Sequence, residues 1–152
     1  MDIINITDHR DDVQSLLNES DTYMQSLYPD ESNHMVSLSN LLNEHTNLIG
    51  VMIGDELAGI GAVKHINEDE TYGEIKRVFV LEKHRGKGLS KVIMRSLHQR
   101  LLEAGIVTAK LETGVYQPEA IGLYRALGYI KCGPFGDYQT DPLSVFMVKK
   151  LV

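Results

Sequence analysis

The chain is poor in cysteine and in long apolar runs, and both shortages limit where it can work. Its single cysteine, Cys132, cannot form a disulfide within the chain, which fits a reducing compartment. A transmembrane helix needs about 18 consecutive apolar residues, and the best local run, 48–54, is far shorter. Acidic residues occupy the start of the chain in place of a basic and apolar signal peptide: Asp2, Asp8, Asp11 and Asp12. We therefore expect a cytoplasmic protein that does not contact the membrane.

Positive charge is scarce as well. The chain has 15 Lys and Arg residues against 21 Asp and Glu, a net charge of −6, and a pI near 5.4. Such a chain attracts the phosphates of nucleic acids poorly and favours cationic or neutral substrates. Its six histidines show no spacing typical of metal ligands. We expect neither a nucleic-acid partner nor a metal.

Length and composition are those of one globular domain. The chain has 152 residues, of which 43% are hydrophobic and 24% are charged, enough for a substantial core. No linker, internal repeat or low-complexity tract divides it. We predict a single domain over residues 1–152.

The first half of the chain predicts a strand, two helices and a hairpin. Apolar residues recur at helical spacing after a capping residue, Thr7 or Asp8, and a possible break lies near Ser20. Glycine between two β-rich runs is typical of a hairpin. The predicted elements are a strand at 1–6, a helix through Val13, Leu16, Leu17, Met24 and Leu27, a helix from His34 to Glu44, and strands at 48–53 and 57–65 joined by Gly54, Asp55 and Glu56.

The second half alternates strands with helices. One helix carries an apolar face at spacings of three and four, and another begins at Gln117 and Pro118, where the missing proline N–H is tolerated. The predicted elements are a strand at 73–81, a helix burying Leu89, Val92, Ile93, Leu97 and Leu101, a strand at 107–113, a helix burying Ala120, Leu123, Tyr124 and Leu127, and strands at 129–132 and 143–149. The order β-αα-βββ-α-β-α-ββ predicts a mixed α/β fold.

A glycine-rich loop joins the strand at 73–81 to the following helix. It reads Arg85-Gly86-Lys87-Gly88-Leu89-Ser90. Glycines let a backbone turn tightly and expose several N–H groups together, and a helix N-terminus adds its positive dipole, so the loop favours a phosphate. The G-x-x-x-x-G-K-[ST] spacing of a nucleotide P-loop is absent, and Lys91 stands where a dinucleotide motif needs its third glycine.

A second motif, Ala120–Tyr129, reads Ala-Ile-Gly-Leu-Tyr-Arg-Ala-Leu-Gly-Tyr and follows the glycine loop along the chain. Together, the two motifs and the element order resemble the Gcn5-related N-acetyltransferase (GNAT) superfamily. The family's cofactor signature, Gln/Arg-x-x-Gly-x-Gly/Ala, matches Arg85–Ser90, and its Ala-x-x-Leu-Tyr-x-x-x-Gly-Phe/Tyr pattern matches Ala120–Tyr129. Ser90 departs from the usual last position, and Gln117 stands where many members have asparagine. The tail 132–147 resembles that of a bacterial subgroup of uncertain substrate.

The resemblance implies a fold and a cosubstrate. The fold would be a central, mostly antiparallel mixed sheet of about seven strands flanked by about four helices, with splayed central strands forming a slot. Acetyl-CoA would place its pyrophosphate on the glycine loop. Its pantetheine arm would lie beside the strand at 73–81 and pair with it like an added strand. The implied cofactor-binding residues are Val78, Phe79, Val80, Arg85, Gly86, Lys87, Gly88, Leu89, Ser90, Gln117, Ala120 and Leu123.

Acetyl transfer to an amine needs a base, because an alkylamine of pKa about 10.4 is almost wholly protonated at neutral pH. Glu74, at the polar start of its strand, is the candidate general base, directly or through water. It could instead be an ordinary carboxylate paired with Lys76 or Arg77. The resemblance implies that Tyr124 is the general acid for the departing thiolate, whereas its periodicity alone predicts a core tyrosine.

The acceptor site is less defined by the sequence. Acidic side chains such as Glu31 and Glu112 suit an amine, whereas Lys76 and Arg77 suit a substrate carboxylate; for each residue, a solvated loop position is the alternative. The resemblance directs us to the end of the first helix, a strand end and the late loop. The candidate substrate-binding residues are Tyr28, Glu31, Ser32, Lys76, Glu112, Thr113, Phe135 and Tyr138.

The resemblance predicts an acetyl-CoA-dependent N-acetyltransferase that transfers acetyl directly to a small-molecule primary amine. Nothing beside Cys132 in the sequence suggests an activated nucleophile, so we expect no covalent intermediate. The open alternatives are a protein lysine or N-terminal amine as acceptor, and a non-catalytic acyl-CoA-binding regulatory module. Family analogy also suggests a homodimer.

Overall fold

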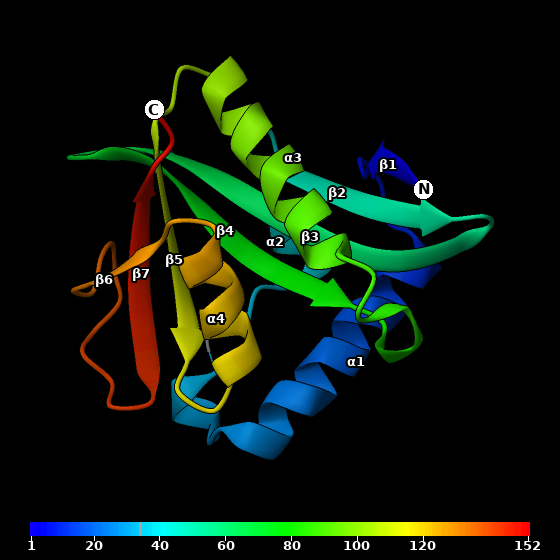
Figure 1. Cartoon of the computed structure of the whole chain (residues 1–152), viewed down its shortest axis with the longest axis horizontal. Helices are drawn as coiled ribbons and strands as arrows, with labels where there is room; N and C mark the ends of the chain where they lie inside the picture. Colours follow the sequence, from blue (N-terminus) through cyan, green and yellow to red (C-terminus); the bar gives the residue numbers. More distant parts are fainter. Residues whose placement is uncertain (34) are drawn as a thin grey trace.

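A twisted seven-stranded sheet runs through the computed structural model, which describes residues 1–33 and 35–152 (Figure 1). Its strand order is β1-β2-β3-β4-β5-β7-β6. All neighbours pair antiparallel except β4 and β5, which are parallel. The strands are β1 (Asp2–Asn5), β2 (Thr46–Ile53), β3 (Glu56–Asn67), β4 (Thr71–Val80), β5 (Thr108–Gly114), β6 (Ile130–Cys132) and β7 (Ser144–Lys150). The predicted mixed α/β fold is confirmed.

Helices cover both faces of the sheet. Helices α3 (Leu89–Glu103) and α4 (Pro118–Ala126) lie on one face, and α1 (Asp11–Leu27) and α2 (Leu38–Leu41) on the other (Figure 1). Short 3₁₀ turns, η1 (Asp30–Ser32) and η2 (Glu82–His84), precede α2 and α3. Each face has its own apolar core, the larger one beneath α3 and the smaller beneath α1 and α2.

The apolar spacing of α3 predicted most of its buried face: Leu89, Ile93, Leu97 and Leu101 are buried against the sheet. Val92 is only half-buried, and Met94, which was not predicted, is fully buried. The predicted hairpin is also present, because Gly54 adopts φ +60° in the two-residue turn between β2 and β3. Local sequence patterns therefore fix these elements well.

Predictions about three helices, α1, α2 and α4, were wrong in part. The helix predicted from His34 to Glu44 extends only over Leu38–Leu41, capped by the Ser37 hydroxyl, and residue 34 lies outside the described residues. Helix α1 is continuous through Ser20, and it begins after Arg10 with no side-chain cap, so neither Thr7 nor Asp8 caps it. The predicted buried face of α4 is only half-buried, because it borders a cavity as well as the core.

The central strands part, as the predicted slot requires. Parallel pairing of β4 with β5 covers only three pairs and stops at Ile75 with Leu111. Just beyond, two residues of β4, Arg77 and Val78, lie opposite one residue of β3, Gly61. This is a β-bulge, which bends a strand and re-aims its side chains. Arg77 adopts φ +59° there, a conformation that L-residues rarely adopt. The bulge therefore marks the place where β4 turns away from β5.

Candidate functional site

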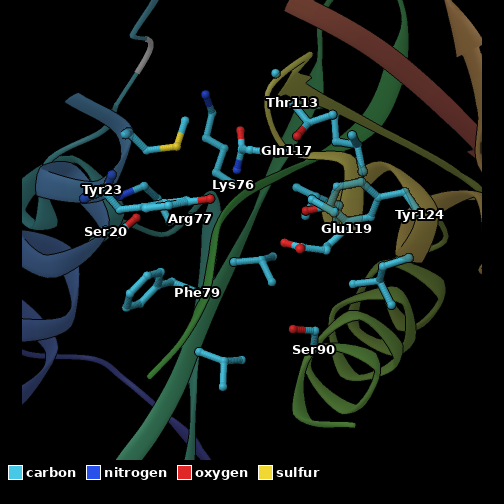
Figure 2. Close-up of a pocket in the computed structure, with 18 of the residues that line it drawn as sticks. Ser20, Tyr23, Lys76, Arg77, Phe79, Ser90, Thr113, Gln117, Glu119 and Tyr124 are labelled. Atoms are coloured by element: carbon cyan, nitrogen blue, oxygen red, sulfur yellow. The ribbon is translucent and has the colours of Figure 1, made fainter. Parts of the chain in front are cut away.

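A cavity of about 460 Å³ opens where β4 and β5 part. Figure 2 shows Ser20, Tyr23 and Arg77 on the α1 side and Thr113, Gln117 and Tyr124 on the opposite side. Ser90, at the start of α3, lies at one end of the cavity. The cavity thus connects the glycine loop to the segments around the end of α1.

The glycine loop, at one end of the cavity, has the geometry of an anion-binding site. Gly86 and Gly88 have φ values of +79° and +77°, and no protein atom lies within 4 Å of where a Cβ would stand on either residue. Gly88 is also the N-cap of α3, and its carbonyl accepts a hydrogen bond from the Val92 N–H (3.2 Å). The N–H groups of the first turn have no intrahelical acceptor, so they suit a pyrophosphate.

Of the two loop cations that we expected to bind the cofactor, Arg85 lines the cavity and Lys87 does not. Arg85 lines the cavity, donates from Nε to the Val80 carbonyl (3.1 Å) and lies 5.6 Å from the centre of the Phe79 ring. Lys87 is not among the described residues that line the cavity, because its Nζ lies 3.1 Å from Nδ1 of His84. The loop therefore meets a ligand mainly through its backbone and Arg85.

Residues Val78–Val80 line the cavity beyond the last β4–β5 pair. On their β5 side the described residues offer no paired strand, so backbone groups along this edge suit an extended ligand. Arg77, at the bulge, donates from Nη1 to Asp21 of α1 (2.6 Å), and its buried Nε has no partner among the described residues. The ion pair ties the bulge to α1.

Tyr124 of α4 lines the cavity on the side opposite α1 (Figure 2). Burial raises the pKa of Tyr124 to about 12, so the phenol keeps its proton at neutral pH. Its ring packs edge-on against Tyr129, with centroids 5.9 Å apart. The Tyr129 hydroxyl in turn lies 2.6 Å from Nε2 of the buried His98. A buried pair thus supports the ring of Tyr124 from behind.

Glu74 lies behind the cavity wall. Its carboxylate accepts a hydrogen bond from the Tyr138 hydroxyl (2.6 Å) and forms a salt bridge with Lys76 Nζ (3.1 Å). Tyr138 and Lys76 line the cavity, whereas Glu74 is buried and is not among the described lining residues. The pairing with Lys76 that the sequence left open is therefore present, and the role of Glu74 as a base stays a prediction.

The far end of the cavity is built from hydrogen-bonded side chains. The Tyr28 hydroxyl accepts from the Tyr116 N–H (3.0 Å) and donates to Gln117 Oε1 (3.3 Å). Ser32 donates to Asp141 (2.8 Å), which links η1 to the loop before β7. The predicted residue Glu112 lines this end and accepts from the Ser144 hydroxyl (2.8 Å).

Two predicted acceptor residues lie elsewhere. Glu31 is exposed and is not among the described lining residues. Phe135 is buried, and its ring packs against Tyr72, Tyr138 and Phe146. Phe135 therefore supports Tyr138 from behind and does not face the cavity. The remaining predicted cofactor- and acceptor-side residues line it: Val78, Phe79, Val80, Arg85, Gly86, Gly88, Leu89, Ser90, Gln117, Ala120, Leu123, Tyr28, Ser32, Lys76, Glu112, Thr113 and Tyr138.

Sequence reasoning missed the α1 wall of the cavity. The apolar face of α1 continues beyond Leu17, and that continuation could have been read as a lining face. Both nearby cations are also paired, Arg77 with Asp21 and Lys76 with Glu74, which leaves the option of a substrate carboxylate with less support. The missed lining residues include Ser20, Tyr23, Met24, Met35, Val36 and Glu119.

Other kinds of site find no support in the part of the chain that the structure describes. No group of His, Cys, Asp and Glu side chains there could hold a metal ion, and no helix there is long and apolar enough to span a bilayer. Cys132 does not line the cavity, and burial raises the pKa of its thiol. An inactivated thiol outside the cavity is a poor nucleophile.

Comparisons with known proteins agree with this geometry. A family model described as the acetyltransferase (GNAT) family matches residues 11–129. The "IAA acetyltransferase" of Azospirillum brasilense is 39% identical over 93% of this chain and 92% of its own length. The "Uncharacterized N-acetyltransferase YsnE" of Bacillus subtilis is 38% identical over 91% of this chain and 92% of its own length.

Solved structures share the fold. A Klebsiella pneumoniae protein whose crystal structure carries the name acyl-CoA N-acyltransferase has a TM-score of 0.85 and 31% identity, over 99% of this chain and 97% of that one. The PaiA N-acetyltransferase of Thermoplasma acidophilum, solved with coenzyme A, has a TM-score of 0.75 over 99% of both chains. At 18% identity, the second structure shows a shared fold alone.

Proposed function

The chain belongs to the acetyltransferase (GNAT) family, and from this premise we propose that it transfers acetyl directly from acetyl-CoA to a primary amine of a small molecule. It is an N-acetyltransferase that uses an acyl-CoA. One observation supports direct transfer to such an amine: a single cavity joins the backbone N–H groups at the start of α3 to Tyr124 and to a hydrogen-bonded end that we assign to the acceptor. Both substrates can therefore be held at once.

The residues at the loop end fit a CoA. The open space over Gly86 and Gly88 admits a phosphate to the backbone, and the first turn of α3 supplies the N–H donors. The edge of Val78–Val80 suits the amide-bearing pantetheine arm. When bound, acetyl-CoA supplies a thioester, an activated acyl group.

The chain's own residues would manage two protons. We assign Glu74 as the base that takes the proton of the acceptor amine, because removing that proton at neutral pH costs roughly 4–5 kcal/mol for an amine of pKa about 10.4. We assign Tyr124 as the acid that protonates the leaving sulfur. Its pKa of about 12 keeps the phenol protonated until it is needed.

The shape and charge of the acceptor end favour a small amine. The end is walled by α1, η1 and the loop before β7, which Ser32 and Asp141 hold together. Glu112 in its lining suits a cationic acceptor. A protein amine and a cofactor-sensing module remain as outcomes of the test.

The test is a free-thiol release assay with acetyl-CoA and four kinds of acceptor: amino acids, spermidine, kanamycin and a lysine-bearing peptide. Acetyl-CoA binding is measured by calorimetry alongside, and mass spectrometry identifies the acetylated product. Thiol release that depends on a small amine supports the proposal. Release with the peptide alone supports a protein acceptor, and tight acetyl-CoA binding without turnover supports a sensor.

A further inference from the structure

Glu74 has a position that its proposed role does not explain by itself. The carboxylate is buried behind the cavity wall, and the side chains that line the cavity in front of it are Lys76 and Tyr138. We propose that the proton of the acceptor amine reaches Glu74 through the hydroxyl of Tyr138, so that Tyr138 is a catalytic residue. This inference rests on the proposed function.

Three polar groups meet at this point. The Tyr138 hydroxyl donates to Glu74 Oε2 at 2.6 Å, a short distance typical of a strong bond to a charged oxygen. Lys76 Nζ lies 3.2 Å from the same hydroxyl and 3.1 Å from the same carboxylate oxygen. Lys76 therefore holds both partners together. A phenolic oxygen both donates and accepts hydrogen bonds, as a relay requires.

The Tyr138 ring is fixed by aromatic neighbours. It packs edge-on against Phe135, with centroids 5.2 Å apart, and tilts against Phe146 at 5.4 Å. The Tyr138 N–H also bonds to the Phe135 carbonyl (3.1 Å). A hydroxyl held in this way keeps its aim toward Glu74 without ordering a water molecule. Positioned groups of this kind transfer protons with little reorganisation.

The proton balance of the step is simple. The lone pair of the amine forms the N–C bond as the C–S bond of the thioester breaks, the departing sulfur takes the Tyr124 proton, and the second N–H proton of the nitrogen returns to Tyr124. The first N–H proton of the ammonium passes to Tyr138 Oη while the Oη proton passes to Glu74 Oε2. The phenol ends as it began, and Glu74 gains one proton. Burial and the neighbouring Glu74 raise the pKa of Tyr138, so a free phenolate does not form and the two transfers are concerted.

Among the described residues, the charged and titratable groups that face Tyr138 include side chains of two strands. Lys76, Glu74 and Tyr72 face it from β4, and Glu112 faces it from β5. Within this set, Glu74 accepts the hydrogen bond that the Tyr138 hydroxyl donates. A pH profile of wild type, Tyr138→Phe and Glu74→Gln therefore separates the relay from its neighbours.

The experiment compares Tyr138→Phe, Glu74→Gln and the double variant, using the panel amine with the highest wild-type rate. We expect each single variant to lower kcat/KM roughly 100-fold, within the range of general-base effects. The double variant should be no slower than either single one, because both remove the same route. Both single variants should also lose the same acidic limb of the pH profile and keep the wild-type Kd for acetyl-CoA by calorimetry.

Tyr72→Phe is the matched control. It removes a hydroxyl from the same aromatic cluster, and Tyr72 is not among the described residues that line the cavity. Its rate should stay near that of wild type. Tyr138→Phe that keeps the wild-type pH limb, or effects that add in the double variant, would overturn the relay and leave water as the route to Glu74. Wild type without amine-dependent thiol release would contradict the proposed function, and the relay with it.

Discussion

The two ends of the cavity are built by opposite means. The end at the glycine loop, where we propose that CoA binds and which we call the CoA end, is mainly backbone: two glycines with positive φ and the first turn of one helix, all within residues 85–91. The acceptor end consists of side chains from segments far apart in the sequence, such as Ser32 with Asp141 and Tyr138 with Glu74, which are 109 and 64 residues apart.

This difference indicates which end of the cavity can change its ligand specificity through side-chain substitutions. We propose that the same acyl donor binds at the CoA end for every acceptor, mainly through backbone groups. Single substitutions at Tyr28, Ser32 or Glu112, which line the other end, should then change the acceptor that binds and leave the CoA end the same. Backbone and side-chain substitutions should therefore have separable effects.

The largest expected effect is at the CoA end. Gly88→Val places a β-branched residue at φ +77° and a side chain in the open space over the loop. We expect acetyl-CoA affinity to fall roughly 1,000-fold, about 4 kcal/mol. Calorimetry measures the loss. Gly122→Ala, on the exposed side of α4 with no atom near its Cβ position, is the control and should bind normally. Retained affinity in Gly88→Val would remove the pyrophosphate from this loop.

Tyr124 lies between the two ends, and Tyr124→Phe should separate chemistry from binding. We expect kcat to fall roughly 1,000-fold, within the range for a general acid, with the Kd of acetyl-CoA unchanged. Thiol release and calorimetry check the two parts. A parallel loss of affinity would instead make the hydroxyl a structural group of the CoA end. Tyr72→Phe should leave both quantities unchanged.

The stability contributed by the buried pair of His98 and Tyr129, which packs behind Tyr124, should depend on pH. Burial lowers the pKa of His98 to about 4, below its ordinary value of 6.5. As the pH falls, His98 therefore takes up a proton at a higher pH in the unfolded chain than in the folded protein. The stability that depends on neutral His98 is intact above pH 6.5 and is lost as the pH falls toward 4. Between pH 7.5 and 4.5 we expect His98 to account for a loss of about 2–3 kcal/mol in the free energy of unfolding.

Urea unfolding of wild type and His98→Gln at both pH values measures this loss. Glutamine does not titrate and can still hydrogen-bond the Tyr129 hydroxyl. The other titrating groups are shared, so the difference between the two variants isolates His98. Equal losses in the two proteins would show that His98 is not held neutral by its burial.

The smallest expected effect is at the acceptor end. A Cβ at Gly114 would overlap the ring and hydroxyl of Tyr28. Gly114→Ala should push Tyr28 away from the Tyr116 N–H and from Gln117, and raise the KM for the amine roughly 10-fold, about 1.4 kcal/mol. The Kd of acetyl-CoA should not change. Gly122→Ala again serves as control, and a change in cofactor affinity alone would contradict the separation of the two ends.

The sequence predicted the CoA end better than the acceptor end for a physical reason. Glycines, a helix start and the periodic face of α3 are local signals, and Gly86 and Gly88 lie as the loop motif indicates. The bulge at Arg77 carries no such signal, because a non-glycine residue gives no sign of a positive φ. Its conformation depends on the contact with Asp21 across the fold.

The acceptor end needed tertiary information. The charges of Lys76 and Glu112, and the place of Tyr138 on the late loop, identify these residues as candidates, but their partners could not be read from the sequence. Phe135 carries the same kind of signal as Tyr138 and yet packs behind it. The length of helix α2 was overpredicted, because the apolar residues of this segment follow a helical spacing although the helix ends at Leu41.

Initial-rate kinetics with both substrates varied test the central claim most directly, namely that one cavity holds donor and amine together and that acetyl moves between them without an acyl-enzyme. The account predicts double-reciprocal lines that intersect, as a ternary complex requires. Parallel lines, the kinetic sign of a covalent intermediate, would contradict direct transfer and with it the two-ended cavity.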